Sequence, residues 1–164
     1  NLNIHTFGNP KEHLEIGHFC SIANNVKFLL SGEHNYKIVS TYPFKAKFDI
    51  LESECLCKGP ITVGDDVWIG ENSIILSGVK IGTGAVIGAG SIVSNNIPPY
   101  AIYANGKIIK YRFSKEIIRE LLKIDYNNLN KDKINTELKI LYENVTNENV
   151  NFIVNKINGD ENER

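Results

Sequence analysis

One histidine stands in a sequence context that suits acid–base chemistry. His34 follows Ser31-Gly32-Glu33. A free imidazole has a pKa of about 6.5, so at neutral pH it can take a proton from a hydroxyl that attacks an acyl group. Glu33 is adjacent and would normally point away, so a backbone carbonyl and a carboxylate are both candidates for the group that orients the ring. Without further context, a solvated loop histidine is the simpler interpretation.

The other residues that could do chemistry form no standard catalytic pattern. The sequence has no Gly-x-Ser-x-Gly elbow and no Gly-x-x-x-x-Gly-Lys phosphate loop, so a covalent serine mechanism has no support. Its three cysteines, Cys20, Cys55 and Cys57, are odd in number and lack a standard metal-ligand spacing. They predict reduced, partly buried thiols in a cytoplasmic protein.

A six-residue repeat predicts the scaffold around His34. An aliphatic residue occupies positions 63, 69, 75, 81, 87 and 93, and glycine follows four of these six. A second phase, Ile16-Gly17, Ile22-Ala23 and Phe28, lies upstream and is out of step with the first. An excursion must therefore interrupt the repeat at about residues 29–60.

The repeat predicts an all-β solenoid of short strands. Its period differs from the spacing of about 3.6 for a helix and of about 8–12 for hairpin arrays. Three units would close a triangular coil, with aliphatic residues stacked inside at about 4.8 Å from strand to strand. Glycine after the aliphatic residue suits turn backbone that other residues adopt poorly. We expect Pro98-Pro99 to close the coil.

The chain is predicted to have two parts, a β-helix domain at residues 1–113 and a helical extension at 114–164. Aromatic residues and Pro43 make the excursion an ordered active-site loop rather than a disordered one. Ser114 is a good helix N-cap, and further helices are expected at about 131–143 and 147–157. These helices would cap the end of the coil, and the residues after Gly159 would form a frayed polar end.

Six segments carry a family resemblance: Gly32-Glu-His34-Asn, Ser40-Thr-Tyr-Pro-Phe44, Gly64-Asp-Asp-Val-Trp-Ile-Gly70, Gly88-Ala-Gly-Ser91, Ile97-Pro-Pro-Tyr-Ala101 and Ile108-Ile-Lys-Tyr-Arg-Phe-Ser114. They resemble the xenobiotic acetyltransferases, a family of hexapeptide-repeat acyltransferases that includes streptogramin and chloramphenicol acetyltransferases and surface-polysaccharide O-acetyltransferases. The resemblance implies a left-handed parallel β-helix, acetyl-CoA as donor, direct transfer with His34 as general base, and a homotrimer with its active site between subunits.

The resemblance also implies residues that bind the two substrates. The cofactor would contact residues on and after the coil: Trp68, Ala89, Ser94, Asn95, Lys107, Lys110 and Arg112. The acceptor would contact aromatic residues of the excursion: Tyr36, Tyr42 and Phe44. Relatives often have Thr-Lys where this chain has Ser94-Asn95, and residues 103–107 are about two residues shorter than in relatives. A packing role for Trp68 and a solvated role for each charge are the alternatives.

The acceptor is predicted to be a sugar hydroxyl of a surface polysaccharide or its precursor. The alternative within the same class is a hydroxyl of a streptogramin or chloramphenicol antibiotic. A different class is a non-catalytic or metal-binding hexapeptide scaffold, because the spacing of His13 and His18 is similar to that of a metal-ligand pair in γ-class carbonic anhydrases. The third ligand would have to be His34 or His5, neither of which fits that pattern, so no metal is expected.

Composition excludes several other classes. The chain has 164 residues, with 18 Lys and Arg against 19 Asp and Glu, for a formal net charge of −1. This balance gives no electrostatic case for binding nucleic acid or an anionic membrane. No apolar run approaches the roughly 20 residues of a membrane helix, and the first residues do not form a signal peptide. We therefore expect a cytoplasmic protein without membrane insertion.

Overall fold

The structure, a computed structural model, describes residues 2–159. The predicted frayed end, at residues 160–164, lies outside the described residues. The chain divides into two compact units between Lys110 and Tyr111. Among the described residues, no helix is both long and apolar enough to span a membrane.

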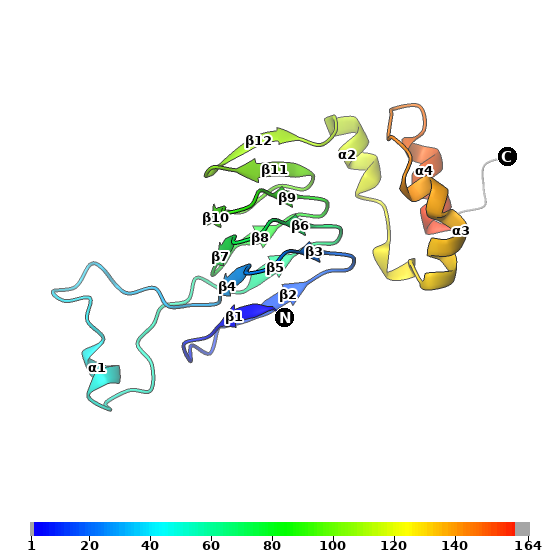
Figure 1. The fold of residues 1–164 in the computed structure, drawn as a ribbon. Coiled ribbons are helices and arrows are strands. Elements are labelled where there is room, and N and C mark those ends of the chain that lie inside the picture. Colours follow the sequence, from blue (N-terminus) through cyan, green and yellow to red (C-terminus); the bar gives the residue numbers. More distant parts are fainter. Residues whose placement is uncertain (1, 160–164) are drawn as a thin grey trace. The chain divides into compact units, whose positions relative to one another are not determined.

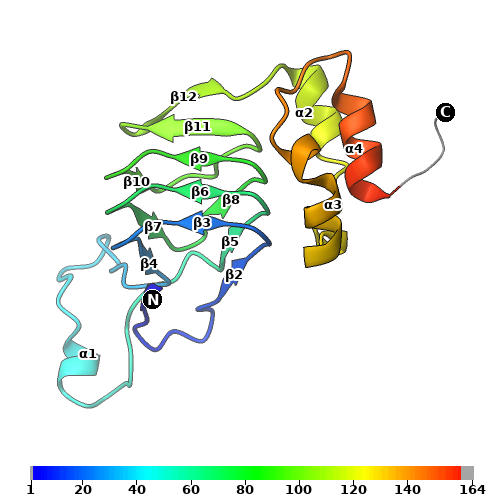
Figure 2. The same ribbon diagram turned by 45° about the vertical axis from the view of Figure 1, so that its right-hand side comes forward.

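The first unit is a parallel β-helix, as the repeat predicts (Figures 1 and 2). One sheet contains β1 (Asn3–His5), β4 (Lys27–Leu29), β7 (Ile74–Leu76) and β10 (Ile92–Val93). A second contains β2 (Leu14–Ile16), β5 (Ile61–Val63) and β8 (Lys80–Ile81). A third contains β3 (Ser21–Ile22), β6 (Trp68–Ile69), β9 (Val86–Ile87), β11 (Ala101–Ala104) and β12 (Lys107–Tyr111). From β1 to β10 the chain visits the three sheets in turn, so each circuit of three strands stacks on the circuit before it.

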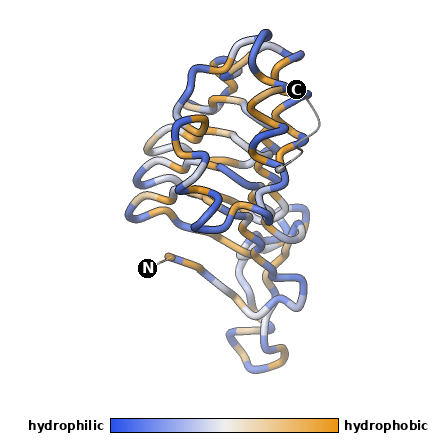
Figure 3. The backbone as a smooth tube through the Cα atoms, turned by 90° about the vertical axis from the view of Figure 1, so that its right-hand side faces the viewer, coloured by the Kyte–Doolittle hydropathy of each residue, from blue (hydrophilic) through white to orange (hydrophobic). Residues whose placement is uncertain are grey.

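The first residue of each repeat unit points into the coil, where it meets its counterparts above and below. In the first sheet Ile75 lies between Phe28 and Val93 in register, and all three are fully buried. Figure 3 shows hydrophobic residues recurring from coil to coil. Burial of such aliphatic side chains, at about 1.5–3 kcal/mol each, is the main term that holds the coils together.

The glycines of the repeat have a different role from the one that the sequence suggests. The second-position glycines do not adopt a positive φ; a β-carbon on Gly70 would lie 2.5 Å from the backbone nitrogen of Ala89 in the next coil. Close approach of successive coils therefore requires them. The positive φ angles occur two residues later, at the fourth position of five of the six units: Asp66, Asn72, Gly78, Gly84 and Gly90.

The coil does not end at Pro98-Pro99, and this prediction was wrong. The two prolines occupy a corner, where no ladder N–H is needed, and β11 then pairs in parallel with β9. Asn105 and Gly106 both have positive φ, as in the type I′ turn that Asn-Gly favours, and they connect β11 to β12. The first strand, β1, was also missed, although its Ile4 lies 12 residues before Ile16 and pairs in register with Phe28.

The predicted excursion connects β4 to β5 and contains the short helix α1 (Phe44–Lys47). It extends away from the coils in Figure 1. It leaves the coil at the corner between the first and second sheets. This corner is the one that positions His34.

The second unit contains the predicted C-terminal helices: α2 (Lys115–Leu121), the 3-10 helix η1 (Tyr126–Asn128), α3 (Lys131–Leu141) and α4 (Val150–Asn158). The Ser114 hydroxyl accepts a hydrogen bond from the backbone N–H of Ile117, which confirms the predicted N-cap. Leu129, Ile153 and Ile157 form a small core of their own. The 3-10 helix was not predicted, because three residues give no periodic signal.

Candidate active site

The two arms of the excursion pair at its base and form a neck. The N–H of Leu56 donates to the carbonyl of Glu33 at 2.7 Å, and the N–H of Gly32 donates to the carbonyl of Leu56 at 3.2 Å. His34 is the next residue beyond this pairing. Its backbone is therefore held at the point where the excursion leaves the coil.

Gly32 makes the neck possible. Its φ is +107°, and a β-carbon there would lie 2.9 Å from Cε2 of Phe7 in the coil below. Next to it, the Glu12 carboxylate accepts hydrogen bonds from the Ser31 hydroxyl and from the Phe7 N–H at 2.8 Å. Burial opposes ionisation of Glu12, but these hydrogen bonds outweigh it and lower the pKa of the carboxyl. The ionised Glu12 carboxylate thus holds the neck against the first coil through these hydrogen bonds.

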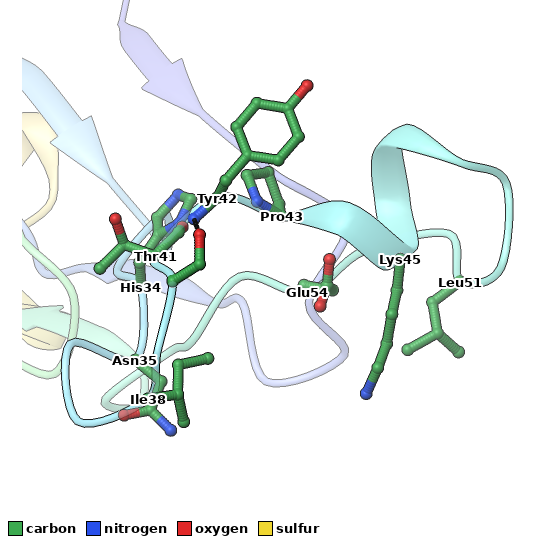
Figure 4. A pocket seen from close by; sticks show the side chains of 10 residues that line it. His34, Asn35, Ile38, Thr41, Tyr42, Pro43, Lys45, Leu51 and Glu54 are labelled. Atoms are coloured by element: carbon green, nitrogen blue, oxygen red, sulfur yellow. Dashed lines mark hydrogen bonds between the residues drawn. The ribbon is translucent and has the colours of Figure 1, made fainter.

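The imidazole of His34 is oriented by a backbone carbonyl (Figure 4). Its Nδ1 lies 2.6 Å from the carbonyl oxygen of Thr41, farther along the same excursion. A carbonyl can only accept, so Nδ1 carries the proton and donates it to this bond. The neutral ring then has an unprotonated Nε2, which is the form that a general base requires. This geometry resolves the choice between carbonyl and carboxylate that the sequence left open.

His34 lines a cavity of about 290 Å³ that lies within the excursion. Apolar side chains of Ile38 and Leu51 line it beside the polar one of Asn35 (Figure 4). Ser40 also lines it. Glu54 also lines it, with Oε2 accepting the N–H of Ala46 at 3.1 Å. The cavity can therefore hold a molecule with both apolar surface and hydroxyl groups next to a basic nitrogen.

The three aromatic residues predicted to bind the acceptor have different positions. Tyr42 lines the cavity, whereas Tyr36 and Phe44 do not. Tyr36 is 79% exposed, and Phe44 packs edge-on against Tyr42 with ring centroids 4.9 Å apart. Leu51 and Glu54 were missed because they lie on the returning arm, where nothing in the sequence connects them to His34. Thr41 belongs to the Ser40–Phe44 segment that carries the family resemblance, but nothing in the sequence indicates that its backbone carbonyl contacts His34.

The residues predicted to bind the cofactor are spread over two corners of the coil and the segment after it. Trp68 is 56% exposed on the outer face of β6, and Ala89 is exposed in the turn after β9. Both border the corner between the third and first sheets, and the excursion leaves from the next corner. Ser94 and Asn95 lie at the excursion's corner, two circuits farther along, with Asn95 Nδ2 donating to Ser94 Oγ at 3.2 Å. Within one chain, the structure does not bring Trp68 or Ala89 together with His34.

The three basic residues predicted to contact the cofactor all come after β11 in the sequence. Lys107 and Lys110 are exposed on β12. Arg112 belongs to the second unit, where its guanidinium lies 5.3 Å from the ring centroid of Phe113.

The repeat region and most of the β-helix have known relatives. Residues 60–95 match the family described as bacterial transferase hexapeptide (six repeats). Over 126 residues the chain is 41% identical to a probable macrolide acetyltransferase of Lysinibacillus sphaericus, with 71% of this chain and 70% of that protein covered. The chain belongs to the hexapeptide-repeat acetyltransferases of the xenobiotic family.

The chain spans only 60% or less of the length of three other relatives. It is 37% identical over 126 residues to a chloramphenicol acetyltransferase of Klebsiella aerogenes, and it spans 60% of that protein. Among solved structures, a galactoside acetyltransferase in complex with coenzyme A is 34% identical, with 62% of this chain and 50% of that chain covered and a TM-score of 0.48. A maltose O-acetyltransferase from Clostridium difficile 630 is 33% identical, with 62% and 49% covered and a TM-score of 0.47.

The other histidines of this acetyltransferase do not gather around His34. His18 pairs with Asp65, whose Oδ1 lies 3.0 Å from Nδ1 of the ring. His5 lies on β1 and His13 just before β2. In the part of the chain that the structure describes, no three His, Cys, Asp or Glu residues could hold a metal ion together. The metal-binding alternative therefore has no ligand set among these residues.

The three cysteines are free thiols and partly buried, as predicted. Cys55 and Cys57 lie in the returning arm, where Cys57 Sγ donates to the carbonyl of Leu30 at 3.1 Å. Cys20 Sγ donates to the carbonyl of Gly64 at 3.1 Å. Burial, together with the carboxylates of Asp65 and Asp66, raises the pKa of the Cys20 thiol.

Proposed function

We propose that this chain transfers an acetyl group from acetyl-CoA to a hydroxyl group, with His34 as the general base. The observation that carries the proposal is the hydrogen bond from His34 Nδ1 to the Thr41 carbonyl at 2.6 Å. It leaves Nε2 as the basic atom beside a cavity. The acetyltransferase relatives supply the class of reaction.

The reaction needs only one proton carrier. Nε2 of His34 takes the proton from the acceptor hydroxyl while the hydroxyl oxygen attacks the thioester carbonyl. The bond between the carbonyl carbon and sulfur then breaks, and the imidazolium returns the proton to the departing thiolate. The products are an O-acetyl ester and free CoA. Thr41 keeps the ring in one orientation throughout and stabilises the imidazolium, because Nδ1 remains a donor in both protonation states.

We propose an antibiotic with a free hydroxyl as the acceptor. Two of the sequence relatives are named as a probable macrolide acetyltransferase and a chloramphenicol acetyltransferase, and this favours the alternative acceptor class over the polysaccharide sugar that the sequence analysis put first. Ile38, Leu51 and Tyr42 give the cavity an apolar component that suits a largely apolar antibiotic better than a bare sugar. A surface-polysaccharide sugar is the second candidate, and Asn35 and Ser40 are the residues that favour it.

The active site is proposed to form between subunits of a homotrimer. Trp68 and Ala89 border a different corner from His34, and this placement supports a cofactor that contacts Trp68 and Ala89 of one chain and His34 of another. The outer faces of the coil support an assembly of this kind. The outward row Trp68, Val86 and Ile102 on the third sheet is apolar, whereas the outward row Glu15, Thr62 and Lys80 on the second sheet is polar. Trp68 is exposed and Val86 and Ile102 are half-buried, and a partly exposed apolar row of this kind is typical of interfaces.

A thiol-release assay tests the proposed function. The protein is incubated with acetyl-CoA and a panel of macrolides, chloramphenicol, streptogramins, nucleotide sugars and free sugars, and CoA release is followed with a thiol reagent. Turnover with an antibiotic and little turnover with sugars is the expected result. Turnover with sugars alone would reassign the acceptor, and no acceptor-dependent CoA release with any compound would overturn the proposal.

A further inference from the structure

Glu33 is a partly buried carboxylate that the proposed reaction does not use. Its Oε1 accepts a hydrogen bond from the Ser77 hydroxyl at 2.8 Å and lies 3.5 Å from Nζ of Lys58. Its Oε2 is buried without a hydrogen-bond partner among residues 2–159. An unpartnered buried carboxylate oxygen is costly. Its place directly before the proposed base points to a role beyond stability.

The contacts of Glu33 join three segments of the chain. Ser77 is 3% exposed and lies in the corner after β7, one circuit above the neck. Its hydroxyl donates to Glu33 on the outgoing arm and accepts from the backbone N–H of Lys58 on the returning arm at 3.2 Å. One buried hydroxyl therefore fastens both arms of the excursion to the rigid coil.

We infer that Glu33 is the positioning residue for His34. The inference rests on the proposed function. The Glu33 backbone is hydrogen-bonded to Leu56, and its side chain is hydrogen-bonded to Ser77. These two contacts together fix the position of the His34 backbone. The Thr41 carbonyl then fixes the ring. Without the carboxylate, the neck loses its hydrogen bond to Ser77 in the corner after β7. The position of His34 Nε2 relative to a thioester bound on the coil is then no longer fixed. A misplacement of about 1 Å can cost about 100-fold in rate.

The test compares Glu33→Ala with Glu33→Gln. Gln keeps an acceptor oxygen for the Ser77 hydroxyl, whereas Ala keeps none. We expect Glu33→Ala to lower kcat by about 10–100-fold with KM for acetyl-CoA within about two-fold, and Glu33→Gln to restore most of kcat. Glu52→Ala is the matched control, because Glu52 is an exposed glutamate of the same excursion that does not line the cavity. It should leave kcat unchanged.

A double-mutant cycle with Ser77→Ala tests the connection itself. If Glu33 acts through Ser77, the double variant is no slower than the slower single variant. Independent losses that multiply would overturn the inference. Thermal melting of each variant shows whether it is folded, and a Glu33→Ala protein that loses kcat only in proportion to its unfolded fraction would also overturn it.

A spectroscopic readout separates this inference from the proposed function. Imidazole ¹⁵N NMR reports the tautomer of His34, and the His34→Asn spectrum identifies its signals. The wild-type protein should show protonated Nδ1, and Glu33→Ala should show mixed tautomers from a mobile ring. A single unchanged tautomer in Glu33→Ala would contradict the positioning role even if the wild-type enzyme acetylates nothing. If the wild-type protein is inactive, but its single tautomer becomes a mixture in Glu33→Ala, only the proposed function is contradicted.

Discussion

Two glycines of the β-helix unit provide a matched test of how the neck supports catalysis. Gly32 and Gly90 both have positive φ, at +107° and +70°. Alanine in a left-handed conformation costs about 1–2 kcal/mol relative to glycine. A β-carbon on Gly90 meets nothing within 4 Å, and one on Gly32 meets the Phe7 ring at 2.9 Å. The Phe7 side chain is 48% exposed and can turn aside, so the backbone strain dominates at both positions.

We therefore expect Gly32→Ala and Gly90→Ala to lower the free energy of unfolding by similar amounts, about 1–2 kcal/mol each. Urea denaturation measures this. Gly32 lies two residues before His34, whereas Gly90 adjoins Ala89 of the proposed cofactor site. At saturating acetyl-CoA, acetyl transfer should therefore fall by about 10-fold or more in Gly32→Ala and stay near wild type in Gly90→Ala. Equal activity of the two variants would refute the idea that the neck positions the base. A Gly32→Ala protein as stable as wild type would refute the strain at this position.

Three further predictions address Glu12, Cys20 and Trp68. The pKa of Glu12 is lowered in the folded protein, so its ionised form stabilises the fold above the ordinary carboxyl pKa of 4.5, and this stabilisation is lost as the pH falls through the lowered pKa. Glu12→Gln should thus melt below wild type at pH 7, and the difference should vanish in strong acid; a constant difference would contradict this. The raised pKa of Cys20 predicts that, in a Cys55→Ser/Cys57→Ser background, its thiol is alkylated more slowly at pH 8 than free cysteine, and an equal rate would contradict it. Trp68 is the only tryptophan, so CoA should change its fluorescence and should raise the melting temperature of wild type more than that of Trp68→Ala. No fluorescence change at millimolar CoA would remove Trp68 from the proposed cofactor site.

The coil could be predicted from sequence because one residue in six must be aliphatic and point inward. Ile75, Ile81 and Ile87 follow that pattern and are buried as it requires. The end of the coil could not be predicted in the same way. Pro99 suggested a stop, but a proline at a corner interrupts no ladder, and β11 pairs beyond it without any glycine of the repeat.

The candidate base could also be predicted, whereas its surroundings could not. His34 stood out by its type and its neighbours, and the structure places it on the cavity. Its partner is a carbonyl, which every residue has, and no sequence pattern singles out that of Thr41. Glu54, on the returning arm, and Ser77, in the corner after β7, lie 20 or more residues from His34 and Glu33 in sequence, and only folding brings them to the outgoing arm.

The central claim is that Nε2 of His34 is the general base. His34→Asn tests it most directly, because the Asn amide can still donate to the Thr41 carbonyl while nothing replaces Nε2. We predict a fall in kcat of about 10²–10⁴-fold, with CoA binding retained and with no effect of chelators on either protein. Wild-type turnover in His34→Asn, or turnover that chelators abolish, would contradict the account.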